Sequence, residues 1–204
     1  KPPVVILAAG ASERLGTCKA LVQLGGVSAL ERLLREARRG GAEDILIVVG
    51  AHRPEIEESF ARSDARHRAP LLHNPDWPRG RTGSLALAAA HFGDRALLVA
   101  PIDVPMVSGE VFASLFEAWE DAGDPPRGWL APCVDPGPRF GHPIVLGRAL
   151  ATQLRALDSE TPLARLRAEA APLLSVRVAD VAILDDLDTP DDLKRIQGRC
   201  LTEG

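Results

Sequence analysis

The sequence predicts an α/β fold in which helices cover both faces of a mostly parallel sheet. Three short runs of apolar residues, at positions 4–9, 45–49 and 96–100, are typical of strands that are buried on both faces. Segments in which apolar residues recur at helical spacing lie between these runs. Because parallel strands must be joined by long crossover segments, this alternation indicates repeated βαβ units and three layers.

The first two elements show both patterns. Val4–Ala9 is a continuous apolar run that ends at Gly10, which predicts a central strand. From Ser28 to Arg39 the apolar residues follow helical spacing, and Gly40 supplies a stop signal. The next elements are expected in the order strand 45–49, helix 54–62, weak strand 71–73, helix 84–92, strand 96–100 and helix 108–122.

The last third of the chain opens with a loop and an antiparallel ribbon. The Pro- and Gly-rich segment 121–128 predicts a loop, because too few residues follow it for a second core. Residues 129–134 and 143–146 are expected to pair across the loop 135–142. The whole chain is therefore expected to form a single domain over residues 1–204.

Capping signals predict two helices near the end of the sequence. Thr161 stands before Pro162, and Thr189 stands before Pro190. A threonine hydroxyl caps a helix well, and proline is favoured in the first turn. A helix is therefore predicted after each threonine.

Composition and charge exclude several classes of protein. The net charge is −4 and the arginines are dispersed, so no nucleic-acid partner is expected. The three cysteines form no C-x-x-C pair, which argues against a disulfide framework or a zinc site. The first residues lack the longer apolar region of a signal peptide, and no apolar run is long enough to span a membrane. A cytoplasmic protein without a membrane partner is therefore expected.

The strongest local signal is the glycine-bounded segment Leu7–Lys19, which follows the first strand. Its glycines allow backbone N–H groups to turn towards an anion, and Arg14 and Lys19 can contact a polyphosphate. A Walker loop needs a lysine directly after its second glycine, whereas Lys19 follows Gly16 by three residues. A dinucleotide-binding fingerprint does not fit either. The alternative interpretation is a surface turn with solvated cations.

This segment resembles the opening motif L-A-[AG]-G-x-S-x-R-x-G-x-x-K of the nucleotidyltransferase family that includes molybdenum cofactor cytidylyltransferase and guanylyltransferase. The resemblance continues at Asn74–Trp77 with Gly80 and Ser84, at Asp103–Pro105, at Gly141–Pro143 and at Asp186–Leu193. It implies a Rossmann-like nucleotidyltransferase fold. It also implies that Arg14, Lys19 and Asp103 are catalytic, and that the nucleotide is bound by Leu7, Ala8, Ala9, Gly10, Ser12, Arg14, Lys19, Asn74, Gly80 and Ser84.

The resemblance implies that Asp103 holds Mg²⁺. Its position after the strand 96–100 also predicts that Asp103 lies at the carboxyl edge of the sheet, where open α/β folds bind ligands. Carboxylate, water and phosphate oxygens are the ligands that Mg²⁺ prefers. The alternative is an aspartate that only forms a turn between two prolines.

A second Mg²⁺ ligand is expected near the last helix. Capping explains Thr189, Pro190 and Asp192 but leaves Asp188 without a role. We therefore expect Asp188 to be the second ligand, with Asp186 as the alternative.

Two further positions carry open interpretations. The family commonly has two consecutive serines where this chain has Gly83 and Ser84, so a hydroxyl contact is either missing or replaced by a backbone N–H. His142 is expected to shape the acceptor pocket, although a histidine between Gly141 and Pro143 can equally be held there by a tight turn.

The family resemblance implies transfer of a nucleoside monophosphate from a triphosphate to molybdopterin. CTP is favoured over GTP, because Ala9 stands where the guanylyltransferases typically have glycine. The acceptor could instead be a sugar phosphate, phosphocholine or phospholactate. A non-catalytic chaperone that delivers the cofactor to a molybdoenzyme is the alternative from another class, and a molybdoenzyme or its chaperone is a possible partner in either case.

Overall fold

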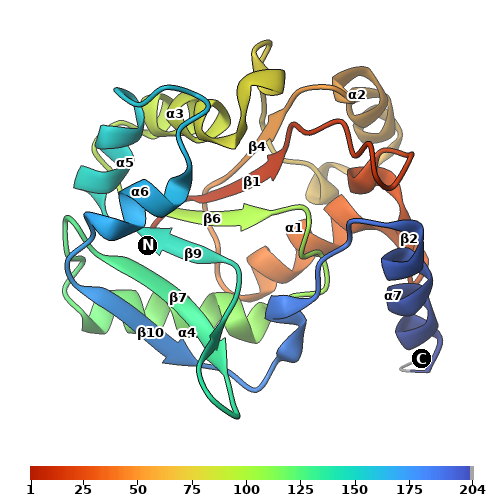
Figure 1. Ribbon diagram of the computed structural model, residues 1–204. Helices are drawn as coiled ribbons and strands as arrows, with labels where there is room; N and C mark the ends of the chain where they lie inside the picture. Colours follow the sequence, from red (N-terminus) through yellow and green to blue (C-terminus); the bar gives the residue numbers. More distant parts are fainter. Residues whose placement is uncertain (203–204) are drawn as a thin grey trace.

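A twisted sheet with helices on both faces forms the body of the protein (Figure 1). The computed structural model describes residues 1–202 of the 204. The strands are β1 (Val4–Ala8), β2 (Gln23–Leu24), β3 (Val27–Ser28), β4 (Ile45–Val49), β5 (Leu71–His73), β6 (Leu97–Pro101), β7 (Trp129–Val134), β8 (Arg139–Phe140), β9 (Ile144–Leu146) and β10 (Leu173–Arg177). The helices are α1 (Ala29–Arg39), α2 (Arg53–Arg62), α3 (Arg81–Phe92), α4 (Gly109–Asp121), α5 (Arg148–Leu154), α6 (Leu163–Ala168) and α7 (Pro190–Thr202).

The large sheet has the strand order β10-β7-β9-β6-β1-β4-β5, and β8 pairs with the last two residues of β7. The strands β6, β1, β4 and β5 are parallel, as are β7 and β10. β9 runs antiparallel to both β6 and β7. The short strand β8 is antiparallel to β7. The predicted α/β class and the mostly parallel sheet are therefore confirmed, with β9 as an antiparallel strand in the middle.

The strand β1 is central because every one of its residues faces a core. Val4 and Ile6 belong to the apolar cluster on one face of the sheet, and Val5 belongs to the cluster on the other face. Side chains alternate between the two faces of a strand, so a continuous apolar run is what a strand between two helical layers requires.

Each helical layer buries one apolar stripe. The helices α1 and α4 pack against the face that contains Val4, through residues such as Leu33 and Phe112. The helices α3 and α5 cover the opposite face, through residues such as Leu85 and Leu150 (Figure 1). The predicted three-layer arrangement is the one observed.

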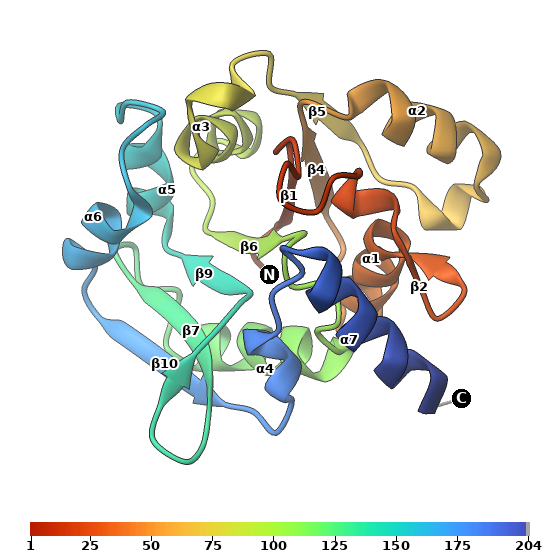
Figure 2. The same ribbon diagram turned by 45° about the vertical axis from the view of Figure 1, so that its right-hand side comes forward.

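The helix α7 lies outside these layers, beside β2 (Figure 2). The Gln197 side chain donates to the Gln23 carbonyl oxygen at 2.9 Å. This contact connects the end of the chain to the segment that follows the glycine loop. Within residues 1–202, no helix is both long and apolar enough to cross a membrane.

Several elements differ from the sequence prediction. The strands β2, β3 and β10 and the helix α5 were not predicted, and β8 lies inside the segment predicted to be only a loop. Thr161 does not cap α6, because Pro162 occupies the N-cap position and no side chain caps this helix. The Thr161 carbonyl oxygen instead accepts a hydrogen bond from Thr82 at 2.6 Å.

Candidate functional site

The glycine loop follows β1 and is shaped by Ser12. Ser12 has a left-handed φ of 56°, and its carbonyl oxygen accepts hydrogen bonds from the backbone N–H groups of Leu15 and Gly16. Its hydroxyl oxygen accepts from the backbone N–H of Lys19 at 3.3 Å. Gly16 has a φ of 76°, which other residues rarely adopt. The loop therefore turns back on itself and brings Lys19 to the end of β1.

The segment after β4 supports the other side of this loop. The His52 ring nitrogen Nε2 lies 3.0 Å from the Ala11 carbonyl oxygen, and the Ala51 N–H donates to the Ala9 carbonyl oxygen. At Gly50, a Cβ atom would lie 2.4 Å from that same Ala9 oxygen, so only glycine allows this approach. These contacts give His52 a structural role beside the loop.

Lys19 joins the two aspartates that were predicted to bind metal. Its ammonium nitrogen lies 2.6 Å from Asp103 Oδ1 and 2.8 Å from Asp188 Oδ1. The lysine is buried, while about a third of the Asp103 side chain and about a quarter of the Asp188 side chain are exposed. Arg14, which is largely exposed, also donates to Asp188 at 2.8 Å. The sequence predicted that both cations would contact phosphate, whereas here each is also engaged with a carboxylate.

Backbone contacts fix the distance between the two aspartates. The Leu187 N–H donates to the Asp103 carbonyl oxygen at 2.7 Å, which holds residues 186–188 against the end of β6. The helix α7 begins directly afterwards. Asp192 accepts from the backbone N–H and the hydroxyl of Thr189, and its own N–H donates back to the Thr189 hydroxyl oxygen. The predicted capping interaction is confirmed, and it leaves Asp188 free to face Lys19.

The charges in this cluster separate the two candidate second ligands. The hydrogen bond from Lys19 and the nearby Arg14 lower the pKa of Asp188, so this group is ionised near neutral pH. Burial, and then the carboxylates of Asp188 and Asp103, raise the pKa of Asp186. Asp186 makes no ion pair with Lys19 or Arg14 among the residues described. The geometry therefore favours Asp188 over Asp186 as the partner of Asp103.

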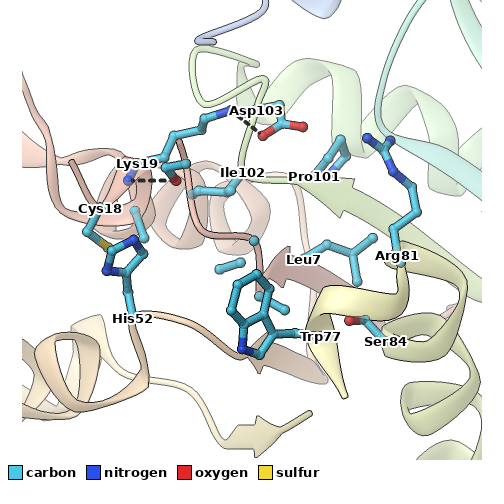
Figure 3. Close-up of a pocket in the computed structure, with 16 residues that line it drawn as sticks. Leu7, Cys18, Lys19, His52, Trp77, Arg81, Ser84, Pro101, Ile102 and Asp103 are labelled. Atoms are coloured by element: carbon cyan, nitrogen blue, oxygen red, sulfur yellow. Dashed lines mark hydrogen bonds and ion pairs between the residues drawn. The ribbon is translucent and has the colours of Figure 1, made fainter. Parts of the chain in front are cut away.

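A cavity of about 260 Å³ opens beside this cluster (Figure 3). Its wall includes Leu7, Ala8, Ala9, Gly10, Ser12, Lys19, Gly80, Ser84 and Asp103, which are nine of the residues that were predicted for the site. A second cavity of about 300 Å³ continues from it past Ser12 and contains Arg14 and Asp188. The carboxyl edge of β1 and β6 thus gathers nearly all of the predicted site residues.

Asn74 was predicted to bind the nucleotide but lines neither of these two cavities. Its side chain is buried, donates to the Ser84 hydroxyl oxygen at 2.9 Å and accepts from the Asp76 N–H at 3.0 Å. Asn74 therefore orients Ser84, which does face the cavity.

Steric crowding explains why glycine precedes Ser84. A Cβ atom at Gly83 would lie 2.6 Å from the Ser159 hydroxyl oxygen. A side chain at position 83 would therefore collide with Ser159, and the Ser159 hydroxyl group lies in the place where a serine at position 83 would begin. Gly80 is similarly confined, because it has a φ of 130° and its Cβ would lie 2.5 Å from the Ser159 carbonyl oxygen.

Two side chains of the cavity wall that are suited to contact a nucleotide, Trp77 and Arg81, were not among the predicted site residues. Trp77 lies across the cavity from Asp103, and Arg81 begins α3 and reaches towards the side where Asp103 lies (Figure 3). Both lie close to Gly80 in the sequence, so their place in the segment 74–84 that resembles the family could have identified them. An aromatic side chain and a further cation make the cavity suitable for a base and a phosphate.

His142 lies farther along the same edge of the sheet. Its backbone N–H donates to the Ile183 carbonyl oxygen at 3.0 Å, and its buried ring nitrogen Nδ1 has no hydrogen-bond partner in the structure. Burial, and then the Arg81 guanidinium, lower the pKa of His142, although Asp103 opposes this shift. The imidazole is therefore neutral near neutral pH. Its position is compatible with both interpretations, a turn residue and a residue of the acceptor pocket.

The two carboxylates suit a hard divalent cation. Asp103 and Asp188 both approach one positive centre, the Lys19 ammonium, so their oxygens converge. Within the described part of the chain, no group of three or more His, Cys, Asp or Glu side chains could hold a metal ion. One or two carboxylates, completed by water and substrate phosphates, is the arrangement that Mg²⁺ commonly has in proteins.

The MobA-like NTP transferase domain family matches residues 4–173, which include the glycine loop and Asp103. The chain belongs to this family. It is thus a member of a nucleotidyltransferase family, and the resemblance seen in the sequence is confirmed.

Curated relatives of the chain fall into several groups. The molybdenum cofactor cytidylyltransferase of Escherichia coli is 24% identical over 92% of this chain and 91% of its own length. The molybdenum cofactor guanylyltransferase of Xanthomonas euvesicatoria is 34% identical over 54% of this chain and 51% of its own length. A bifunctional IPC transferase and DIPP synthase of Rubrobacter xylanophilus is 40% identical, but the match covers 48% of this chain and only 23% of that protein.

Solved structures show the same fold. A nucleotidyl transferase from Methanothermobacter has a TM-score of 0.80 at 20% identity, with 99% of this chain and 98% of that chain covered. A Mycobacterium tuberculosis protein in complex with manganese has a TM-score of 0.76 at 21% identity, with 97% and 98% covered. At this identity the likeness concerns the fold alone.

Proposed function

We propose that this member of the MobA-like family transfers cytidine monophosphate from CTP to the phosphate of a molybdopterin-type acceptor and releases pyrophosphate. The observation that supports this most is the meeting of Lys19, Asp103 and Asp188 beside a cavity lined by the glycine loop. Cations and carboxylates at a phosphate-sized loop are the groups that phosphoryl chemistry uses. The glycine loop and Ser84 would bind the triphosphate, and Trp77 would contact the base.

Asp103 and Asp188 would hold Mg²⁺. When bound, a divalent cation withdraws charge from phosphate oxygens and stabilises the charge that develops during transfer. The Lys19 ammonium has three N–H donors, and two of them point to the carboxylates. The third remains for a phosphate oxygen, so Lys19 would both position the aspartates and bind the triphosphate.

The reaction would be a direct displacement at the α-phosphorus. An oxygen of the acceptor phosphate forms a bond to the α-phosphorus, and the bond to the bridging oxygen of pyrophosphate breaks. Pyrophosphate leaves with the bonding electron pair. A phosphate monoester is largely a dianion at pH 7, so the attack requires no general base. The side chains of Arg14 and Lys19 would neutralise the charge that accumulates on the leaving group.

Ala9 supports CTP over GTP. It lies in the wall of the cavity, and an alanine at this position resembles the cytidylyltransferases, whereas the guanylyltransferases typically have glycine. A non-catalytic carrier is the rival interpretation, and it gives no reason for Arg14, Lys19 and Asp103 to meet in one cluster. A molybdoenzyme or its chaperone would receive the product.

The nucleotide preference is tested by thermal unfolding with CTP, GTP, ATP and UTP, each with Mg²⁺. At equal ligand concentration, a ligand that binds only the folded state raises the melting temperature more, the tighter it binds. We expect CTP to produce the largest shift, and Ala9→Gly to reduce the difference between CTP and GTP. An equal or larger shift with GTP in the unchanged protein would rule out the cytidylyl assignment and leave the family membership intact.

A further inference from the structure

A groove continues along the sheet edge towards β10 from the cavity of about 260 Å³, which we call the nucleotide cavity. A cavity of about 520 Å³ shares Gly80 and Arg81 with the nucleotide cavity. A further cavity of about 360 Å³ shares Trp129, His142 and Arg167 with the cavity of about 520 Å³. Arg81 thus lies at the junction of nucleotide cavity and groove, and Arg167 lies where the two parts of the groove meet.

Arg81 and Arg167 give the groove a positive lining. Among residues 1–202, neither guanidinium has a carboxylate within ion-pair distance, whereas Arg79 in the same wall is paired with Asp158 at 3.2 Å. Glu160 is the acidic side chain of the wall and offsets part of this charge. Unpaired guanidinium groups in a concave surface are suited to bind phosphate or other anionic groups.

The far part of the groove is aromatic. Phe140 is 48% exposed, although a phenylalanine gains stability when it is buried. The Arg167 guanidinium lies 6.0 Å from the centre of the Phe140 ring. Trp129 forms part of the floor beside the neutral imidazole of His142, whose Nδ1 has no partner. A flat ring with hydrogen-bonding edges could therefore lie between these side chains.

We propose that Arg81 and Arg167 bind the two ends of the acceptor and together select it. Arg81 holds the acceptor phosphate beside the α-phosphate of the nucleotide, and Arg167 with Phe140 holds a flat, polar ring system at the other end. This inference rests on the proposed function, and it adds the residues that distinguish a phosphorylated ring compound from a simple sugar phosphate. A hexose phosphate would fill only the part of the groove beside Arg81.

The test measures binding without turnover. A pterin that carries a phosphomethyl group and a hexose 1-phosphate are each titrated by calorimetry into protein saturated with a non-hydrolysable CTP analogue. We expect Arg167→Met to weaken pterin binding about tenfold and to leave hexose phosphate binding unchanged, because a charge-assisted contact is lost at one end only. Arg81→Met should weaken both probes by about tenfold or more.

Arg165→Met is the matched control, because Arg165 lies on the same helix, is exposed and is not in the groove wall. It should bind both probes as the unchanged protein does. Equal binding of the pterin by the unchanged protein and Arg167→Met would overturn the inference, as would no pterin binding at all. Nucleotide transfer is assayed separately, so its failure would count against the proposed function while the binding data still decide the groove.

Discussion

Lys19 has a double role in the cluster that the glycine loop forms with Asp103 and Asp188. It is buried, it is fixed through its backbone by Ser12, and its ammonium keeps two carboxylates close together. Without this cation the carboxylates would repel each other at short range in a partly dry environment. The loop thus stabilises the same negative charges that a divalent cation would use.

Replacing Lys19 by alanine should weaken CTP binding and lower turnover together. A cation on the phosphates contributes to both the ground state and the transition state. We expect at least a tenfold increase in the dissociation constant for CTP, measured by calorimetry. Lys194→Ala is the control, because Lys194 is exposed and its ion pair is with Asp191, away from the cluster. Unchanged binding and rate would show that the glycine loop is only a turn.

His142 should make the fold sensitive to acid. Burial and Arg81 lower its pKa from the ordinary 6.5, so the folded chain binds a proton at this site less readily than the unfolded chain. As the pH falls below that ordinary value, the unfolded chain takes up protons first and the free energy of unfolding decreases. We expect urea unfolding of His142→Gln to lose less stability than the unchanged protein between about pH 7 and pH 5. Identical pH dependence would contradict this.

At the scale of single elements, the start of α7 connects fold stability to the site. The reciprocal bonds between Thr189 and Asp192 fix the first turn, and Asp188 immediately precedes it. Both residues could be predicted from the sequence, because a capping pair is a local pattern. Asp188 could not be assigned in this way, because its partners Lys19 and Arg14 lie more than 150 positions earlier in the chain.

Thr189→Ala should destabilise the protein by about 1 kcal/mol, because the N–H of Asp192 loses its acceptor. For a chain of this size that corresponds to a decrease in melting temperature of about 2–4 °C. The affinity for metal with CTP should also fall, because the turn that presents Asp188 is loosened. Thr152→Ala, at an exposed position of α5, is the control. If both variants melt at the same temperature, the cap contributes nothing.

The elements that the sequence did not reveal have weak local patterns. The strand β10 lies at the edge of the sheet with alternate residues exposed, and it contains a serine and an arginine among three apolar residues. The helix α5 has only seven residues, too few for a clear helical period. Buried strands such as β1 were predicted because burial on both faces demands a continuous apolar run.

At the scale of the whole molecule, the site exists because the sheet is parallel at its centre. The strands β1, β4 and β6 end at the same edge, so the loops after them meet there although they are far apart in sequence. Because open α/β folds bind ligands at the carboxyl edge of the sheet, the sequence could predict that Asp103 lies at this edge. The pairing of Lys19 with both aspartates, and the groove beyond Arg81, depend on side-chain positions that no local pattern specifies.

The most direct test of the proposed function measures release of pyrophosphate from CTP in the presence of molybdopterin and limiting Mg²⁺, with the unchanged protein and Asp103→Asn. The exchange keeps the shape of the side chain but removes the charge that would retain the metal, so the fold should remain nearly as stable. We expect the rate to fall roughly a hundredfold or more, while CTP still binds with less dependence on Mg²⁺. Asp121→Asn, at an exposed position on α4, should keep the full rate. A folded Asp103→Asn protein that transfers the nucleotide at the unchanged rate would show that Asp103 is only a turn residue and that the proposed metal site is wrong.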